Sequence, residues 1–170
     1  GYLPNAETVE PDTKLGLDDM FELVRKADED YRTLQEKKEK LKQKIEEYRA
    51  KQQIVAPFRP LECDLHRVLH YRYITYRFGR IAVEFYHKMQ KYLMDDLKAI
   101  FVEGERDESY VYGVYFVSQA ETQKVDAVFR SLHFERIELK DEFEGTPDTA
   151  YRVLENEIAR VNLEIEDLDK

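Results

Sequence analysis

The chain is organised around residues 18–52, DDMFELVRKADEDYRTLQEKKEKLKQKIEEYRAKQ. Its apolar residues recur in steps of three and four, with one double step across Lys38. This spacing is a heptad repeat, which keeps a narrow apolar seam on one side of an α-helix and is typical of a coiled coil. The seam residues of this stretch are Val24, Ala27, Tyr31, Leu34, Leu41, Ile45 and Tyr48.

A second seam of the same kind lies at the other end of the sequence. Thr146 and Pro147 predict the start of a helix, with the threonine as cap and the proline in the first turn. The two seams predict an antiparallel two-helix coiled-coil arm, in which the second helix (146–170) is truncated and leaves part of the first seam bare or covered by a neighbour. The seam residues of the second helix are Leu154, Ile158, Val161, Ile165 and Leu168.

Prolines and glycines predict where the first arm helix begins and ends. Residues 1–16 contain Pro4, Pro11 and Gly16 without periodicity, so we expect a linker or disordered terminus there. Pro57 and Pro60 oppose helix and push the residues before them towards extended geometry. The sequence therefore predicts an arm helix over 17–53 and a connector over 54–68.

Between the two arm helices, residues 69–141 alternate between strand and helix patterns. The order is strand, helix, strand, strand, helix, strand, and a tight charged turn separates the two middle strands. This order predicts an α+β fold with a ferredoxin-like βαββαβ lobe, in which both helices cover one face of a four-stranded antiparallel sheet. The strands are expected at 70–78, 99–103, 110–117 and 134–139, with a helix at 83–97 and another around Val125, Val128, Phe129 and Leu132.

The composition fits a modest lobe attached to solvated helices. Charged residues make up 37% of the 170 residues, the mean hydropathy is −0.69 and the net charge is −9. A net negative chain is not attracted as a whole to nucleic acid or anionic lipid. No apolar run approaches the roughly 20 residues of a membrane-spanning helix, and the first residues do not resemble a signal peptide. The chain begins with Gly1, so we expect an excised piece of a longer protein.

The motifs of common enzyme and cofactor sites are missing from the sequence. It contains no GxGxxG, GxxxxGK[ST], HExxH or GxSxG, so we predict no catalytic residue and no cofactor. His66 and His70 lie four residues apart, just after Cys63, and on a helix the two rings could share a metal ion. A zinc site needs three or four convergent ligands, so surface or packing roles are favoured and no metal is predicted.

Residues 66–91 form a local basic window in an acidic chain. The window holds six arginines and lysines against one acid, Glu84, and tyrosines lie between them. Aromatic and basic residues on a sheet are also typical of RNA-binding modules, so a nucleic-acid-binding ferredoxin-like domain with a coiled-coil dimerisation arm is the alternative. We favour contact with an acidic protein partner. The predicted partner-binding residues are Arg72, Arg77, Arg80, Lys88 and Lys91.

Four short motifs occur in an order that resembles a known family. RFGRI (77–81), followed by Phe85 and Tyr86, resembles the RFGR-(L/I)-P…Y stretch of the a subunit of rotary V/A-type ATPases and ATP synthases, called subunit I in bacteria. FVE (101–103) with YVYGVYF (110–116) resembles the paired strands F.E…YVWGVYF of that family. SLHFERI (131–137) and GTP (145–147) resemble its SLxFERI and GTP(E) motifs. The resemblance covers about residues 17–170.

The resemblance implies a non-catalytic piece of the N-terminal cytosolic domain of subunit a/I, at the cytoplasmic face of a membrane. In the family, two α/β lobes joined by a helical arm bind peripheral stalks of E and G subunits, so that the stator resists torque during proton or sodium transport coupled to ATP synthesis or hydrolysis. Ala82 replaces a usual proline, and Tyr112 stands where tryptophan is common. The family's membrane half lies outside this sequence, so no proton-path residue is carried over, and a truncated arm is expected to self-associate.

Overall fold

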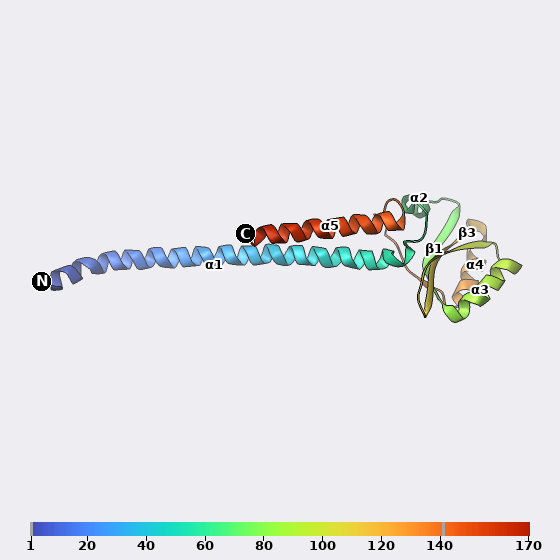
Figure 1. The fold of residues 1–170 in the computed structure, drawn as a ribbon, viewed down its shortest axis with the longest axis horizontal. Helices are drawn as coiled ribbons and strands as arrows, with labels where there is room; N and C mark the ends of the chain where they lie inside the picture. The colour runs from blue at the N-terminus through green and yellow to red at the C-terminus, as the bar shows by residue number, and fades with distance from the viewer. Residues whose placement is uncertain (1, 141) are drawn as a thin grey trace. The chain divides into compact units, whose positions relative to one another are not determined.

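The computed structural model describes residues 2–140 and 142–170. Contacts divide the chain into two units, an arm unit (Gly1–Ile45 with Val161–Lys170) and a lobe unit (Glu46–Arg160). The elements in chain order (Figure 1) are α1 (Tyr2–Val55), η1 (Ala56–Phe58), α2 (Leu65–Leu69), β1 (Ile74–Ala82), α3 (Val83–Asp95), β2 (Ala99–Arg106), β3 (Tyr110–Ser118), η2 (Gln119–Glu121), α4 (Thr122–Ser131), β4 (Glu135–Arg136) and α5 (Pro147–Leu168).

The lobe unit is built on a four-stranded sheet in the order β2-β3-β1-β4. Every neighbouring pair is antiparallel, and β1 pairs with β3 along its whole length, from Ile74 opposite Ser118 to Ala82 opposite Tyr110. The tight turn between β2 and β3 makes them a hairpin. The prediction of an α+β fold with a four-stranded antiparallel sheet is confirmed.

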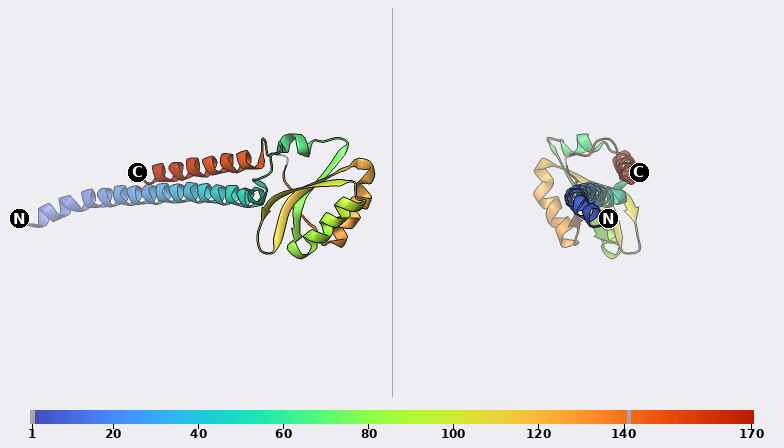
Figure 2. Two further views of the ribbon diagram at one scale, coloured as in Figure 1. Left: turned by 45° about the vertical axis from the view of Figure 1, so that its right-hand side comes forward. Right: turned by 90° about the vertical axis from the view of Figure 1, so that its left-hand side faces the viewer.

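One face of the sheet, which we call the α3/α4 face, is covered by both of these helices (Figure 2). Tyr115 of β3 stacks on Phe129 of α4 with ring centroids 3.8 Å apart, and Phe134 meets both rings edge-on. Close aromatic packing of this kind adds to the stability gained by burying apolar surface. The buried residues on this face are Ile81, Met89, Leu97, Val111, Tyr115, Val117, Val125, Phe129 and Leu132.

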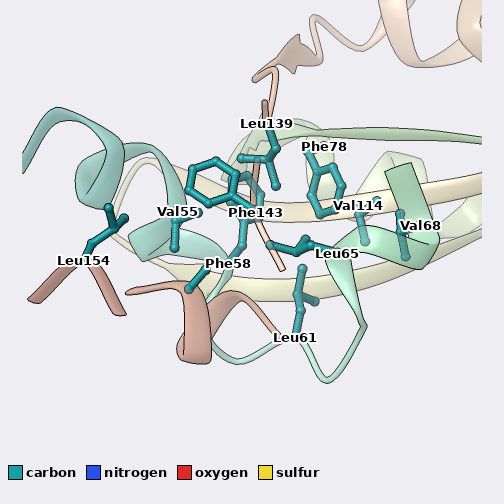
Figure 3. Close-up of a cluster of buried hydrophobic side chains, with 11 residues drawn as sticks. Val55, Phe58, Leu61, Leu65, Val68, Phe78, Val114, Leu139, Phe143 and Leu154 are labelled. Carbon is teal, nitrogen blue, oxygen red and sulfur yellow. The ribbon is translucent and has the colours of Figure 1, made fainter. Parts of the chain in front are cut away.

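The opposite face, which we call the Phe58 face, is covered by segments that are far apart in sequence (Figure 3). Phe58 of η1 is fully buried, and its ring meets Phe78 of β1 edge-on at 5.3 Å between centroids. The last residues of α1, the helix α2, the segment after β4 and the first turns of α5 complete this cluster. Its buried members are Val55, Phe58, Leu61, Leu65, Val68, Phe78, Val114, Leu139, Phe143, Ala150 and Leu154.

The first strand lies four residues further along the sequence than the predicted strand over 70–78, and it contains Gly79. The sequence prediction ended this strand at Phe78 and used Gly79 as its boundary, but β1 continues to Ala82. A Cβ atom at position 79 would collide with the carbonyl oxygen of Glu135 and the ring of Phe134. Glycine therefore lets β4 approach β1, as interior glycines in strands often do.

The fourth strand is shorter than predicted. A strand was expected over 134–139, but β4 contains only Glu135 and Arg136. Beyond it, the Ile137 N–H still donates to the Phe78 carbonyl at 2.9 Å, and then Leu139 and Phe143 are buried in the Phe58 face. Burial of these two side chains draws the chain away from the edge of β1.

The segments before the lobe also differ from the predicted linker and connector. Helix α1 begins at Tyr2, where the sequence predicted a linker over 1–16, and it ends at Val55. Pro4 lies in the first turn, where a residue without a backbone N–H breaks no helical hydrogen bond. The predicted connector contains η1, which includes Pro57, and the start of α2, which Asp64 caps by accepting a hydrogen bond from the Arg67 N–H at 3.1 Å.

Candidate functional site

The residues with metal-binding or nucleophilic chemistry do not converge. His66 and His70 lie with ring centroids 4.5 Å apart, and the His70 Nδ1 is 2.7 Å from the His66 carbonyl oxygen. Burial raises the pKa of the Cys63 thiol, which disfavours the reactive thiolate. Within residues 2–140 and 142–170, no three His, Cys, Asp or Glu side chains are grouped to hold a metal ion, and no helix is long and apolar enough to cross a membrane.

A polar network around Asp126 joins β1, β3 and β4 to α4. Asp126 is 9% exposed, and its Oδ1 accepts a hydrogen bond from the Tyr115 hydroxyl at 2.6 Å. Its Oδ2 lies 3.3 Å from Arg77 of β1 and 3.2 Å from Arg136 of β4. Burial, together with the bond to Asp126, raises the pKa of Tyr115. One buried carboxylate therefore contacts side chains from three strands of the sheet.

Arg80 has its own set of internal partners on β1. Its Nε lies 2.6 Å from the Glu135 carboxylate of β4, and a terminal nitrogen donates to the Tyr112 hydroxyl at 3.4 Å. The guanidinium also lies over the Tyr110 ring, 3.8 Å from the centroid. Tyr112 and then Glu135 raise the pKa of Arg80. Arg80 therefore ties β1 to both of its neighbouring strands.

The five predicted partner-binding residues divide into two groups. Arg77 and Arg80 bond to other parts of the lobe, so their charges serve the fold first. Arg72, Lys88 and Lys91 are exposed, and none of them has an ion pair with any residue that the structure describes. The sequence analysis did not identify Asp126, Glu135 or Arg136 as partners. The available signal was the FERI motif, since its glutamate and arginine both bind arginine or aspartate side chains of the lobe.

The seam residues of the arm also fall into two groups. Of the first helix, Ile45 is buried and Leu34, Leu41 and Tyr48 are half-buried, whereas Ala27 is exposed and Val24 and Tyr31 are 64% and 63% exposed. Of the second helix, Leu154, Ile158 and Val161 are buried, and Ile165 and Leu168 are half-buried.

Polar contacts join α1 to α5 within each of the two units. In the arm unit, Lys38 forms an ion pair with Asp169. In the lobe unit, Gln52 donates hydrogen bonds to Glu155 and to the Tyr151 carbonyl.

An exposed apolar stripe lies on α1 before the segment that pairs with α5. Several large apolar side chains in a row are more than 40% exposed, which is unusual for a monomeric protein surface and marks a contact surface. An amphipathic helix is the partner that such a helical stripe can take. The residues of this exposed stripe are Leu17, Met20, Phe21, Leu23, Val24 and Tyr31.

Comparisons with known proteins found similarity to solved structures. No family model matches the chain, and no curated protein matches it. Among solved structures, the chain is similar to the cytoplasmic N-terminal domain of subunit I, homolog of subunit a, of V-ATPase. The TM-score is 0.49 with 14% identity over 76% of this chain, which spans about half (48%) of the length of the solved domain. That domain is from the family that the four sequence motifs resemble.

Proposed function

We propose that this chain is a non-catalytic stator part of a rotary V/A-type ATPase, from the cytosolic domain of subunit a/I. In this role the chain links the membrane sector to the peripheral stalk of E and G subunits. The link keeps the membrane-bound stator from turning under the torque of rotation. The complete machine transports protons or sodium ions across the membrane at whose cytoplasmic face this domain lies.

The observation that carries the proposal is that the family-like motifs meet in one lobe. RFGRI lies on β1 and FERI at β4, and the two pair directly, with Gly79 opposite Arg136 and Arg80 opposite Glu135. The GTP motif begins α5, where the Thr146 hydroxyl accepts a hydrogen bond from the Thr149 N–H at 3.2 Å. Gly145 before it has φ +74°, which favours glycine. Motifs quoted from separate parts of the sequence thus build a single structure.

The topology of the lobe supports the same proposal. The element order β1-α3-β2-β3-α4-β4 with the strand order β2-β3-β1-β4 is the arrangement expected of a ferredoxin-like lobe. The helices α1 and α5 supply the stiffness that a stator needs, because two paired helices resist bending better than a single helix. In this role, the exposed stripe of α1 would pack against a further helix.

The proposed contacts with the stalk are the exposed basic residues Arg72, Lys88 and Lys91. The test is a calorimetric titration of the chain with the purified E–G heterodimer of the corresponding ATPase. We expect binding, and we expect the double variant Lys88→Glu/Lys91→Glu to weaken it about tenfold, since each reversal removes an attraction and adds a repulsion of similar size. The matched control is Lys124→Glu, which makes the same change on α4.

Two outcomes would count against this proposal in different ways. If the unchanged chain does not bind the E–G heterodimer, the stator role is contradicted. If it binds and the double variant binds equally well, only the location of the contact on α3 is wrong. The reading frame that encodes the chain gives an independent test, because several hydrophobic segments of about 20 residues downstream are expected for subunit a/I.

The nucleic-acid alternative has no specific support in the geometry. Arg77 and Arg80, which made the basic window look like an RNA-binding sheet, are held by Asp126 and Glu135. Each of these guanidinium groups therefore already has a carboxylate partner in the same lobe, although Arg77 shares Asp126 with Arg136.

A further inference from the structure

Half of the outer edge of β1 has no strand partner. Strand β4 pairs with β1 only at Gly79 and Arg80, and one further bond reaches the Phe78 carbonyl. In the part of the chain that the structure describes, the remaining edge of β1, residues 74–77, pairs with β3 on one side and with no strand on the other. An open strand edge is a template on which another chain can add a strand.

Backbone hydrogen bonds show which groups of β1 face this open edge. The Phe78 carbonyl accepts from Ile137 on the β4 side, whereas the Tyr73 carbonyl accepts from Gln119 on the β3 side. Backbone groups of successive residues in a strand point alternately to its two sides. The even-numbered residues Ile74 and Tyr76 therefore direct their N–H groups to the open edge. The Tyr76 carbonyl accepts a hydrogen bond from the Arg77 side chain at 3.2 Å.

A groove of about 460 Å³ runs along this edge. Residues 74–78 of β1 form one wall, and residues 136–139 form the other. Three arginines, Arg72, Arg77 and Arg136, line it together with one carboxylate, Glu138. Even with Asp126 bound to two of these arginines, the groove keeps a net positive charge in a chain of net charge −9.

The two faces of a strand added here would meet different surroundings. Tyr76 packs on the Phe58 face, and Ile74 has the same side-chain direction because residues two apart in a strand share a face. Arg77 points to the α3/α4 face, where it binds Asp126, and Arg136 binds the same carboxylate. An added strand would thus have apolar side chains beside Ile74 and Tyr76, and acidic side chains beside the arginines.

We propose that this groove binds an extended segment of a partner protein in which acidic and apolar residues alternate, as an added strand on β1. The backbone bonds to Ile74 and Tyr76 give affinity, and the arginines select an acidic segment. This inference goes beyond the stator proposal, because the groove shares only Arg72 with the proposed stalk contacts and the argument uses only the lobe.

The test uses the whole chain labelled with ¹⁵N and a synthetic peptide, acetyl-EVEVEVEV-amide. We expect saturating peptide to slow amide hydrogen exchange at Ile74 and Tyr76, because these N–H groups become bonded. Arg72→Glu should weaken binding about threefold to tenfold, the effect of replacing one exposed attraction by a repulsion. Lys91→Glu, which makes the same charge change on α3, should leave the affinity unchanged. Thermal unfolding of each variant shows that the fold is kept.

Two further ligands separate strand addition from other ways of binding. The same peptide methylated on every backbone nitrogen keeps its charge but cannot pair as a strand, and we expect it not to bind. An oligonucleotide of eight uridines is expected not to bind either. The proposal is overturned if the methylated peptide binds equally well, if exchange at Ile74 and Tyr76 does not change, or if the EVEVEVEV peptide does not bind. If the oligonucleotide binds more tightly than the EVEVEVEV peptide and its binding depends on Arg72, the groove is an RNA site and the proposal is wrong.

Discussion

The two faces of the sheet are covered in different ways. The buried residues of the α3/α4 face lie between Ile81 and Leu132, so neighbouring elements in the chain build it. The buried residues of the Phe58 face extend from Val55 to Leu154, so the segments before and after the sheet must come together to build it. The first face needs contacts over at most about fifty residues, whereas the second depends on closing a loop of about one hundred residues.

The two faces also differ in their polar contacts. On the α3/α4 face, the buried carboxylate of Asp126 on α4 has three polar partners on the strands. The Phe58 face relies on apolar packing and on ion pairs at its margin, such as Arg59 with Asp148 at 2.9 Å. We therefore expect the two faces to respond differently to substitution.

The largest expected effect comes from removing one aromatic ring from each face. Phe58→Ala and Phe129→Ala should each lower the free energy of unfolding by about 3–5 kcal/mol, because both rings are almost fully buried and leave cavities. Urea unfolding measures this loss. In hydrogen exchange, Phe58→Ala should expose α2 and the start of α5 while β1, β3, α3 and α4 stay protected. Equal loss of protection everywhere in Phe58→Ala would show that the faces are not separable.

Asp126→Ala tests the polar network of the α3/α4 face. The free energy of unfolding should fall by about 1–3 kcal/mol, because the buried Tyr115 hydroxyl loses its acceptor. Adding Tyr115→Phe removes that hydroxyl, so the double variant should be less destabilised than the sum of the two single variants. Asp95→Ala, at an exposed carboxylate of α3, is the control. Strict additivity of the pair would mean that Asp126 acts only through the arginines.

The ion pair at the margin of the Phe58 face predicts a smaller, pH-dependent effect. The hydrogen bond from Arg59 lowers the pKa of Asp148 below its ordinary value of 3.8. A carboxyl with a lowered pKa stabilises the fold above that ordinary value, and the stabilisation is lost as the pH falls through the folded-state pKa. Arg59→Gln should therefore be less stable than the unchanged chain at neutral pH and approach it in strong acid. A difference in urea midpoint that stays constant with pH would contradict this assignment.

The smallest expected effect is at β2, where no other segment that the structure describes buries Ile100 on the Phe58 face. Ile100 of β2 pairs with Phe116 on this side of the sheet but is 66% exposed. Ile100→Thr should change the free energy of unfolding by no more than about 0.5 kcal/mol, as is usual at exposed sites. Val114→Thr on the same face, at a buried position of β3, is the matched comparison and should be clearly destabilising. A large effect at Ile100 would mean that the cover extends further across the sheet.

Much of the fold could be predicted from sequence because its signals are local. The run of apolar residues in 110–117 predicted β3 almost to its ends, and Thr146 and Pro147 predicted the start of α5. The prediction was wrong where a distant contact decides a boundary. Gly79 looked like the end of a strand, because its role, the approach of Glu135 and Phe134, involves residues more than fifty positions away.

The candidate site shows the same division. Charge alone grouped Arg77 and Arg80 with Lys88 and Lys91 as contact residues. The partners of the first two, Asp126 and Glu135, lie 49 and 55 residues further along the chain, and of the two only Glu135 lies in a recognisable motif, FERI. The open edge of β1 could not be predicted either, because the sequence of 134–139 is compatible with a full-length edge strand.

The sequence by itself determined the heptad seams, the order of helices and strands, the class of the fold and the motifs behind the proposed function. These properties follow from periodicity and capping, which act over a few residues. The tertiary structure decided which side chains cover the Phe58 face, which arginines stay exposed and where β4 ends. Those outcomes depend on burial and ion pairing between segments far apart in the chain. Strand β4 ends early because Leu139 and Phe143 are buried in the core and not at the sheet edge.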